Sequence, residues 1–243
     1  MMRGSAIFVV AVLGICLATT RGAAQTSPTL PPAYAAVKGG LAPLGGLSAD
    51  HEGASFGDSN AGMPIVLDAA QGESGLNVSF AAEFSYLFSL HEFFALGPAI
   101  GMHTWQSEKA EAAGEGVSIG LDLSIVPQAR LPLSEGFEVY VSLPLGITLS
   151  LLNEYTTWVQ DPMVGVAEDV DPTYGWSFGA YLGVRWAIHG SFGVLTEIGY
   201  QRYAFTHGVE FQVNESLDMV GIGDTVSLGL VTQQLRWNVG VFF

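Results

Sequence analysis

Large apolar residues alternate with small or polar residues along most of the chain after residue 32. The segment 137–151 shows the pattern most clearly, because every odd-numbered position in it is apolar, while Glu138, Tyr140 and Ser142 lie between them. A period of two places the two sets on opposite faces of a β-strand, whereas a helix would repeat its apolar residues about every 3.6 positions. The segment is therefore predicted to be a strand with one apolar and one polar face.

The same alternation recurs in other segments, so that eight strands are predicted in all. They span residues 33–47, 76–88, 94–103, 117–130, 137–151, 176–188, 192–201 and 225–243. Long polar connections at 48–74, 106–116, 153–173 and 204–224 alternate with short turns. Short turns join antiparallel neighbours, so the strands are expected to follow one another up and down around a sheet.

The two faces decide which kind of sheet this is. Bulky apolar residues share one face of each strand, and Gly, Ser and isolated charges share the other. Only 13% of the residues are charged, against about 25% in typical soluble domains. A soluble lipocalin-like barrel, the alternative considered, would enclose Trp176 and Trp186 and turn Arg185 and Glu197 outward. The interior of a closed eight-stranded sheet is narrow and suits small residues, while lipid suits the apolar face. The predicted fold class is all-β, an eight-stranded antiparallel up-and-down transmembrane β-barrel.

The N-terminal segment predicts export. Arg3 precedes an apolar stretch at 6–18, and the small residues at 22–24 suit cleavage before Gln25. The alternatives are an uncleaved membrane anchor, for which the apolar stretch is short, and a lipoprotein modified at Cys16, for which Ile15 is unsuited.

The chain is accordingly divided into a signal peptide (1–24), a periplasmic lead-in (25–32) and an outer-membrane barrel (33–243). Outer-membrane barrels have short periplasmic turns and longer extracellular loops. The predicted location is therefore the outer membrane of a Gram-negative cell, with both termini periplasmic.

The charge balance limits the partners. The formal net charge is −15, and removal of the signal peptide takes two arginines with it. Proteins that bind nucleic acid are basic, so no nucleic-acid partner is expected. No cofactor is expected either.

Four basic and four acidic residues lie on the polar faces of the predicted strands. Charges in so narrow a lumen need partners, so they are expected to form an ion-pair network that plugs the barrel. An ion- or solute-conducting path is the alternative. The eight residues are Lys38, Glu83, Asp122, Arg130, Glu138, Arg185, Glu197 and Arg236.

With this strand pattern, over about residues 33–243, the chain resembles the small eight-stranded outer-membrane barrels typified by OmpX and the transmembrane domain of OmpA. The most specific element is the last strand, which ends in an aromatic residue. In that superfamily the strand is read by the barrel-assembly machinery, and the resemblance implies the same partner here. The matching assembly-signal positions are Leu235, Trp237, Val239, Val241 and Phe243.

The four long connections are rich in acidic residues. They are expected to face outward, where they can recruit divalent cations that bridge to lipopolysaccharide; a merely solvated rim is the alternative. Neither 58–62 nor 168–171 completes a calcium loop, because the later ligands are missing, so no metal site is predicted.

Two groups of residues contain side chains that could act in catalysis. His189 and Ser191 with Glu197 resemble the residues of a lipid A deacylase barrel, but they fall at a turn predicted to be periplasmic. His103 is expected to be a hydrogen-bonded lumen residue rather than a base. The predicted function is a non-enzymatic integral outer-membrane barrel with a structural or surface-interaction role in contact with outer-membrane lipid and lipopolysaccharide. A small channel or a lipid A-modifying enzyme is the alternative.

Overall fold

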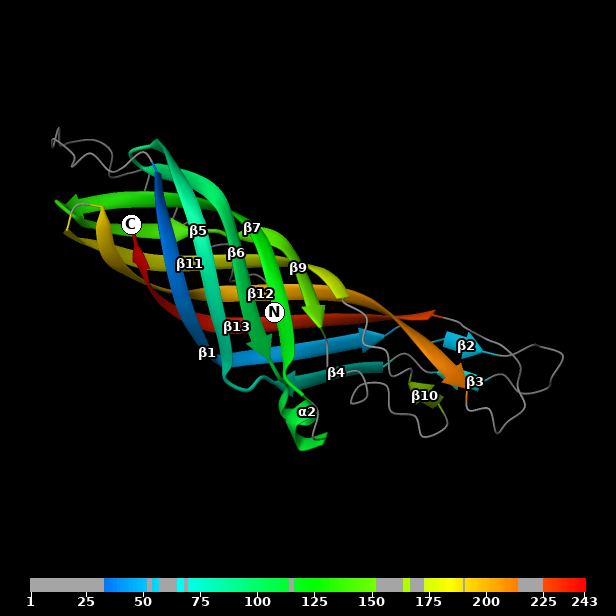
Figure 1. Ribbon diagram of the computed structural model, residues 1–243. Helices are drawn as coiled ribbons and strands as arrows, with labels where there is room; N and C mark the ends of the chain where they lie inside the picture. Colours follow the sequence, from blue (N-terminus) through cyan, green and yellow to red (C-terminus); the bar gives the residue numbers. More distant parts are fainter. Residues whose placement is uncertain are drawn as a thin grey trace, which may run out of the picture.

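The computed structural model describes residues 33–51, 54–56, 65–67, 70–113, 116–151, 164–166, 173–189, 191–213 and 225–243. The predicted signal peptide and lead-in lie outside these residues. Most of the described chain belongs to one antiparallel sheet (Figure 1). Its main strands are β1 (Ala33–His51), β5 (Ser79–His91), β6 (Phe94–Trp105), β7 (Ser118–Ser134), β8 (Phe137–Ser142), β9 (Leu145–Leu151), β11 (Thr173–His189), β12 (Phe192–Val213) and β13 (Thr225–Phe242).

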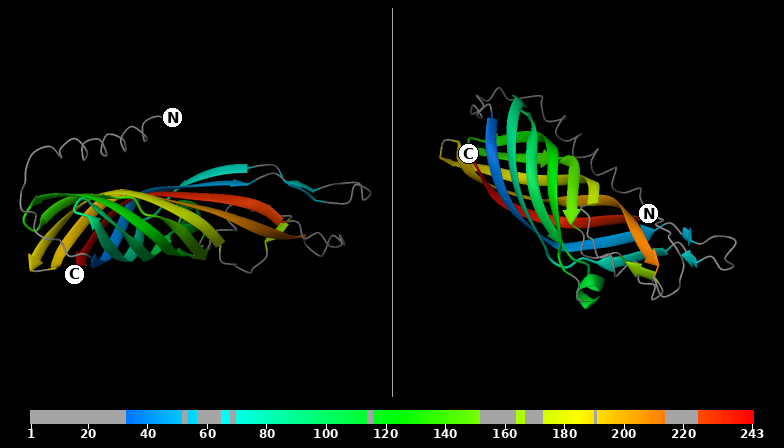
Figure 2. Two further views of the ribbon diagram at one scale, coloured as in Figure 1. Left: turned by 90° about the horizontal axis from the view of Figure 1, so that it is seen from above. Right: turned by 45° about the vertical axis from the view of Figure 1, so that its right-hand side comes forward.

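The sheet closes into a barrel because β13 pairs with β12 on one side and with β1 on the other. Neighbours otherwise follow in chain order, and β8 and β9 together occupy one place between β7 and β11. The first and last strands pair from Ala36 opposite Phe242 to His51 opposite Leu228, side by side in both views of Figure 2. Within the described residues the ring therefore has eight positions, and the predicted antiparallel up-and-down barrel is confirmed.

The strand predicted at 137–151 is interrupted at Leu143 and Pro144. Proline has no backbone N–H and cannot donate to a ladder. The amide of Leu143 still donates to the carbonyl of Pro127 over 3.0 Å, and the amide of Gly179 donates to the carbonyl of Pro144 over 2.8 Å. The interruption therefore leaves the two halves in line and keeps the alternation of faces.

The predicted long connections contain more regular structure than their sequences indicate. β1 continues to His51, where it pairs with β4 (Ala70–Gly75), and β12 continues to Val213. Residues 106–116 include a helix, α2 (Glu108–Ala113). Short strands β2 (Ala54–Phe56) and β3 (Ile65–Leu67) pair with each other, and β10 (Val164–Val166) pairs with β12. These extensions are held by backbone hydrogen bonds between strands. Their side chains no longer alternate between apolar and polar, so the sequence pattern does not reveal them as strands.

One residue of the predicted apolar stripe faces the other way. Leu76 is buried, although it was predicted on the outer face with Val78 and Phe80, which are exposed. The ladder between β1 and the β4–β5 segment is broken at this point, and the amide of Leu76 donates to the carbonyl of Gly45 over 3.1 Å.

The outer wall is apolar around the ring, as the alternation predicts. The side chains on this wall are large and exposed, and they include Phe84, Leu123, Ile147, Trp186 and Trp237. Nothing in the described sheet covers them. Within the described residues, no helix is long and apolar enough to cross a membrane.

The lumen is more aromatic than the sequence indicates. The strand pattern places Tyr140 and Tyr181 inside together with Gly, Ser and isolated charges, and both rings are buried there. The structure adds further large rings, namely Tyr34, Trp105, Tyr203 and Phe205. Glycines on facing strands provide the room. A Cβ on Gly183 would lie 2.4 Å from the ring of Tyr140, and one on Gly120 would lie 2.1 Å from the ring of His103. The sequence does not show this fit, because each ring and the glycine that makes room for it lie on different strands.

Candidate functional site

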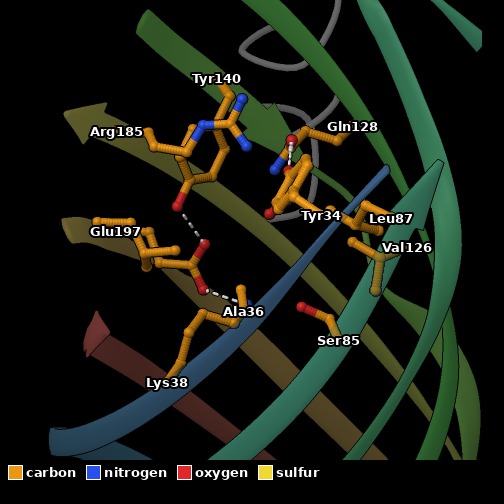
Figure 3. A pocket seen from close by; sticks show the side chains of 12 residues that line it. Tyr34, Ala36, Lys38, Ser85, Leu87, Val126, Gln128, Tyr140, Arg185 and Glu197 are labelled. Atoms are coloured by element: carbon orange, nitrogen blue, oxygen red, sulfur yellow. Dashed lines mark hydrogen bonds and ion pairs between the residues drawn. The ribbon is translucent and has the colours of Figure 1, made fainter. Parts of the chain in front are cut away.

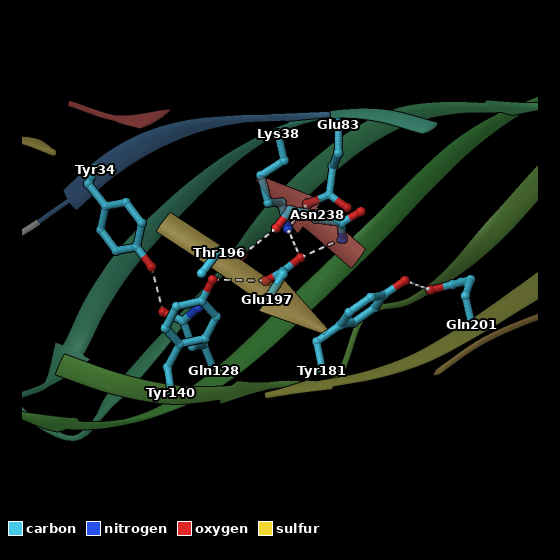
Figure 4. Close-up of polar contacts among 10 residues, drawn as sticks. All are labelled: Tyr34, Lys38, Glu83, Gln128, Tyr140, Tyr181, Thr196, Glu197, Gln201 and Asn238. Carbon is cyan, nitrogen blue, oxygen red and sulfur yellow. Dashed lines mark hydrogen bonds and ion pairs between the residues drawn. The ribbon is translucent and has the colours of Figure 1, made fainter. Parts of the chain in front are cut away.

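Lys38 lies in the lumen between two glutamates. Its Nζ is 2.7 Å from Oε1 of Glu83 on β5 and 2.9 Å from Oε1 of Glu197 on β12 (Figure 4). Lys38 and Glu83 are direct cross-strand partners, whereas Glu197 is reached across β13. The strand register therefore brings together three of the predicted charges.

Glu197 is held by further donors. Asn238 Nδ2 donates to its Oε1 over 2.8 Å, and Tyr140 Oη donates to its Oε2 over 3.0 Å. The residue is 2% exposed. A carboxylate buried this deeply is stable only when both oxygens are engaged, as they are here.

A second ion pair joins Arg185 on β11 to Glu138 on β8, with Nη2 and Oε1 2.7 Å apart. The two residues face each other directly across the ladder. The guanidinium also lies 4.0 Å from the ring centre of Tyr34 and 4.7 Å from that of Phe242. Figure 3 shows Arg185 beside Tyr34 and Tyr140, with Tyr34 Oη donating to Gln128. Two aromatic rings therefore lie within 5 Å of the Arg185 guanidinium.

Asp122 and Arg236 are linked through an aromatic residue rather than directly. Arg236 Nη2 donates to Tyr203 Oη over 2.9 Å, and Tyr203 Oη donates to Asp122 Oδ2 over 3.3 Å. The same carboxylate oxygen lies 2.8 Å from His103 Nδ1. The ring of His103 stacks on Tyr203 with centroids 3.9 Å apart. His103 is therefore a hydrogen-bonded lumen residue, as predicted, and is fully buried.

Arg130 stands apart from the other predicted charges. Its Nη2 donates to the carbonyl of His91 over 3.1 Å and to that of Phe94 over 3.4 Å. No carboxylate lies within ion-pair distance of it among the described residues. Arg130 thus binds backbone near the β5–β6 turn and contributes no salt bridge to the predicted network.

A row of stacked aromatic rings extends from Tyr203, which contacts the charged residues, to Phe205 and Trp105. Trp105 and Phe205 stack with centroids 6.2 Å apart, and Phe205 stacks on Tyr203 at 6.4 Å. All three are buried. Tyr203 and Phe205 lie beyond Gln201, where the strand predicted from the sequence ends, so they are not among the predicted lumen residues. Their odd-numbered positions continue the inward face of β12 and were the signal available.

The space left in the lumen is small. Two cavities have volumes of about 10 and 20 Å³, and each is about large enough for one water molecule. The first is bordered by Lys38, Arg185 and Glu197, and the second by Asp122, Tyr203 and Arg236. Both cavities are thus lined by charged groups of the lumen.

The arrangement considered as a deacylase site is not assembled. His189 and Ser191 are exposed at the β11–β12 turn, whereas Glu197 is buried in the lumen with Lys38. Within the described residues, no three His, Cys, Asp or Glu residues are placed to hold a metal ion.

The residues predicted as the assembly signal share one face of β13. Leu235, Trp237, Val239, Val241 and Phe243 are all exposed on the outer wall. Trp237 Nε1 donates to Thr196 Oγ1 of β12 over 2.8 Å, which holds the indole against the wall. The backbone of Phe243 exchanges two hydrogen bonds of 2.9 Å with Ala35 of β1.

Comparison with known proteins identifies the fold. No family model matches the chain, and no curated protein matches it. Among solved structures, the outer membrane protein OprG from Pseudomonas aeruginosa matches with a TM-score of 0.50 and 9% identity, over 88% of this chain and 96% of that chain. Neisserial surface protein A matches with a TM-score of 0.39 and 11% identity, over 87% and 97% of the two chains. The outer membrane protease OmpT from Escherichia coli matches with a TM-score of 0.43 and 7% identity, over 90% and 99%.

The likeness to OprG and the closed sheet with its apolar wall define the class. The chain folds as a transmembrane β-barrel of the small outer-membrane type, which confirms the resemblance derived from the strand pattern.

Proposed function

We propose that this protein is a non-enzymatic integral outer-membrane barrel with a plugged lumen. The observation that carries the proposal is the lumen itself. Buried ion pairs, Lys38 with Glu83 and Glu197 and Arg185 with Glu138, cross the lumen, and the two cavities beside them each accommodate about one water molecule. A lumen filled in this way supports a structural or surface-interaction role rather than transport of solutes.

The arrangement of the ends supports an orientation with periplasmic termini. Phe242 lies opposite Gly193, immediately after the β11–β12 turn, so the C-terminus is at the end that carries a short connection. The extensions of β1 and β12 lie at the opposite end (Figure 1). Short turns are periplasmic in barrels of this class, and the longer connections are extracellular.

Planar-bilayer recordings of the folded barrel test the plug. We expect no steady conductance steps, while a general porin inserted into the same bilayers serves as the positive control. Stable steps of porin size would contradict the proposal and favour a channel. Lipid A isolated from cells with and without the protein should have the same mass spectrum, and a protein-dependent change would favour a lipid A-modifying enzyme.

The acidic residues of the long connections support a role in binding divalent cations at the cell surface. They are proposed to recruit divalent cations and, through them, lipopolysaccharide phosphates. Calorimetric titration of the folded protein with calcium should show saturable heat, and its absence would remove this part of the proposal.

The outer-wall residues of β13 are proposed to be read by the barrel-assembly machinery. They are exposed along one face of β13, the strand that closes the barrel by pairing with β1. This exposure supports the role, because a partner can contact the stripe before β13 pairs with β1.

A further inference from the structure

One basic residue lies on the outer wall of the barrel. Of the lysines and arginines after residue 32, Lys38, Arg130, Arg185 and Arg236 are buried in the lumen and Lys109 is on α2. Arg202 differs from them, because its position on β12 shares the outward face of Ile198 and Tyr200, both exposed. Arginine on a lipid-facing wall is strongly unfavourable at the middle of the bilayer but costs almost nothing near its surface. Arg202 is therefore expected at an edge of the apolar band.

The neighbouring tryptophans place Arg202 at such an edge. Trp176 and Trp186 are exposed on the outer face of β11 and are separated by ten positions. At about 3.3 Å per residue and a tilt of about 40°, they are roughly 25 Å apart along the membrane normal, the height of the apolar band in outer-membrane barrels. The guanidinium carbon of Arg202 lies 5.9 Å from the ring centre of Trp176. Trp186 pairs with Val194, near the C-terminal end, so Arg202 is at the other end.

The surroundings of Arg202 form what we call the Arg202 patch: Trp176, Tyr200, Arg202 and Gln233. Gln233 on β13 is the direct cross-strand partner of Arg202. Tyr200 Oη donates to Gln233 Oε1 over 2.9 Å, so the amide nitrogen of Gln233 remains as a donor. The Nε of Arg202 is itself buried and has no hydrogen-bond partner among the described residues, so it is not a donor that a ligand can reach, and no described carboxylate lies within ion-pair distance of the guanidinium. The patch therefore presents donors and a positive charge at the membrane surface.

We infer that the Arg202 patch binds a phosphate group of lipid A in the outer leaflet. A planar guanidinium matches two phosphate oxygens, and stacking on an aromatic ring holds it in place without using its N–H groups. The choice of lipid A follows from the end of the barrel at which the patch lies, and it rests on the orientation and location proposed above. Because the long connections at that end are acidic, an anionic lipid needs a cationic contact there, and Arg202 supplies one.

Binding of lipid A to the folded barrel in detergent tests the inference. Native mass spectrometry with bisphosphorylated lipid A should show a saturable complex, and Arg202→Gln should weaken it about tenfold or more, since a hydrogen bond to a charged group contributes about 1.5–3 kcal/mol. Trp176→Leu should also weaken it. Trp186→Leu is the matched control, because it removes the same indole from the opposite edge, and it should leave binding unchanged.

The ligand and its source are tested separately. Dephosphorylated lipid A should bind the wild-type protein about as weakly as lipid A binds R202Q, and phosphatidylglycerol should not compete at equal concentration. Equal binding by wild type and R202Q, equal binding of dephosphorylated lipid A, or full competition by phosphatidylglycerol would overturn the inference.

The migration of each unheated variant on a gel shows whether the barrel is folded. Fractionation of cells shows whether it reaches the outer membrane. Absence from the outer membrane would contradict the proposed function, whereas a correctly located barrel whose R202Q variant binds lipid A normally would contradict this inference alone.

Discussion

Lys38 and Glu197 are separated by 159 positions in the chain, yet the Nζ of one lies 2.9 Å from Oε1 of the other. Their strands, β1 and β12, are not neighbours, and β13 lies between them. The ion pair can form only when β13 pairs with both strands and closes the ring. The charges in the lumen thus report on closure of the barrel.

We expect Glu197→Gln to destabilise the barrel by about 3 kcal/mol, because breaking a buried ion pair leaves the buried Lys38 with one carboxylate fewer. Urea unfolding in lipid vesicles, followed by tryptophan fluorescence, measures the change. Ile198→Val, on the outer face next to it, is the control and should cost about 1 kcal/mol or less. Equal losses in the two variants would show that the ion pair contributes little.

Two glycines in the barrel wall differ in the space around them. A Cβ on Gly120 would meet the buried ring of His103, whereas a Cβ on Gly39 would meet nothing within 4 Å. We expect Gly120→Ala to destabilise the barrel by about 1–3 kcal/mol through overpacking and Gly39→Ala to be neutral or slightly stabilising. The same unfolding assay compares the two variants. A neutral effect of Gly120→Ala would mean that the His103 ring can shift to accommodate the added Cβ at little cost.

Gly136 lies in the β7–β8 turn with a φ angle of +76°. A residue with a Cβ is strained in this region, though asparagine tolerates it better than alanine. We expect Gly136→Ala to cost about 1 kcal/mol or more and Gly136→Asn to cost less. If alanine and asparagine have equal effects on the midpoint of unfolding, the backbone conformation is not the cause.

The backbone and the ring of Phe243 have different surroundings where β13 pairs with β1. Its backbone forms hydrogen bonds with the backbone of Ala35, while its ring is exposed on the outer wall of the barrel. We expect Phe243→Ala, which keeps the backbone bonds, to fold in detergent at nearly the normal yield but to insert poorly into the outer membrane of cells. Folding yield is measured by gel migration and insertion by fractionation. Normal insertion of this variant would argue against an assembly signal at the ring.

Prediction from the sequence worked best for properties of a single strand. The alternation puts the eight predicted charges on the inner face and the stripe from Leu235 to Phe243 on the outer wall. Six of the charges are buried, Glu83 and Asp122 contact the lumen residues Lys38 and Tyr203, and the stripe is exposed. The prediction failed beyond the apolar band, where β12 continues past Gln201 and α2 forms in a predicted loop. There the backbone ladder or local helix formation determines the structure, and neither leaves a period of two.

The sequence by itself determined the strands, the two faces and the class of barrel, because alternation of side chains is a local consequence of extended backbone. Only the tertiary structure decided which charges meet. Lys38 binds two glutamates, Arg236 reaches Asp122 through Tyr203, and Arg130 binds turn carbonyls instead of an acid. These choices depend on the register between strands and on rings that fit against glycines across the lumen, and both are set when the sheet closes.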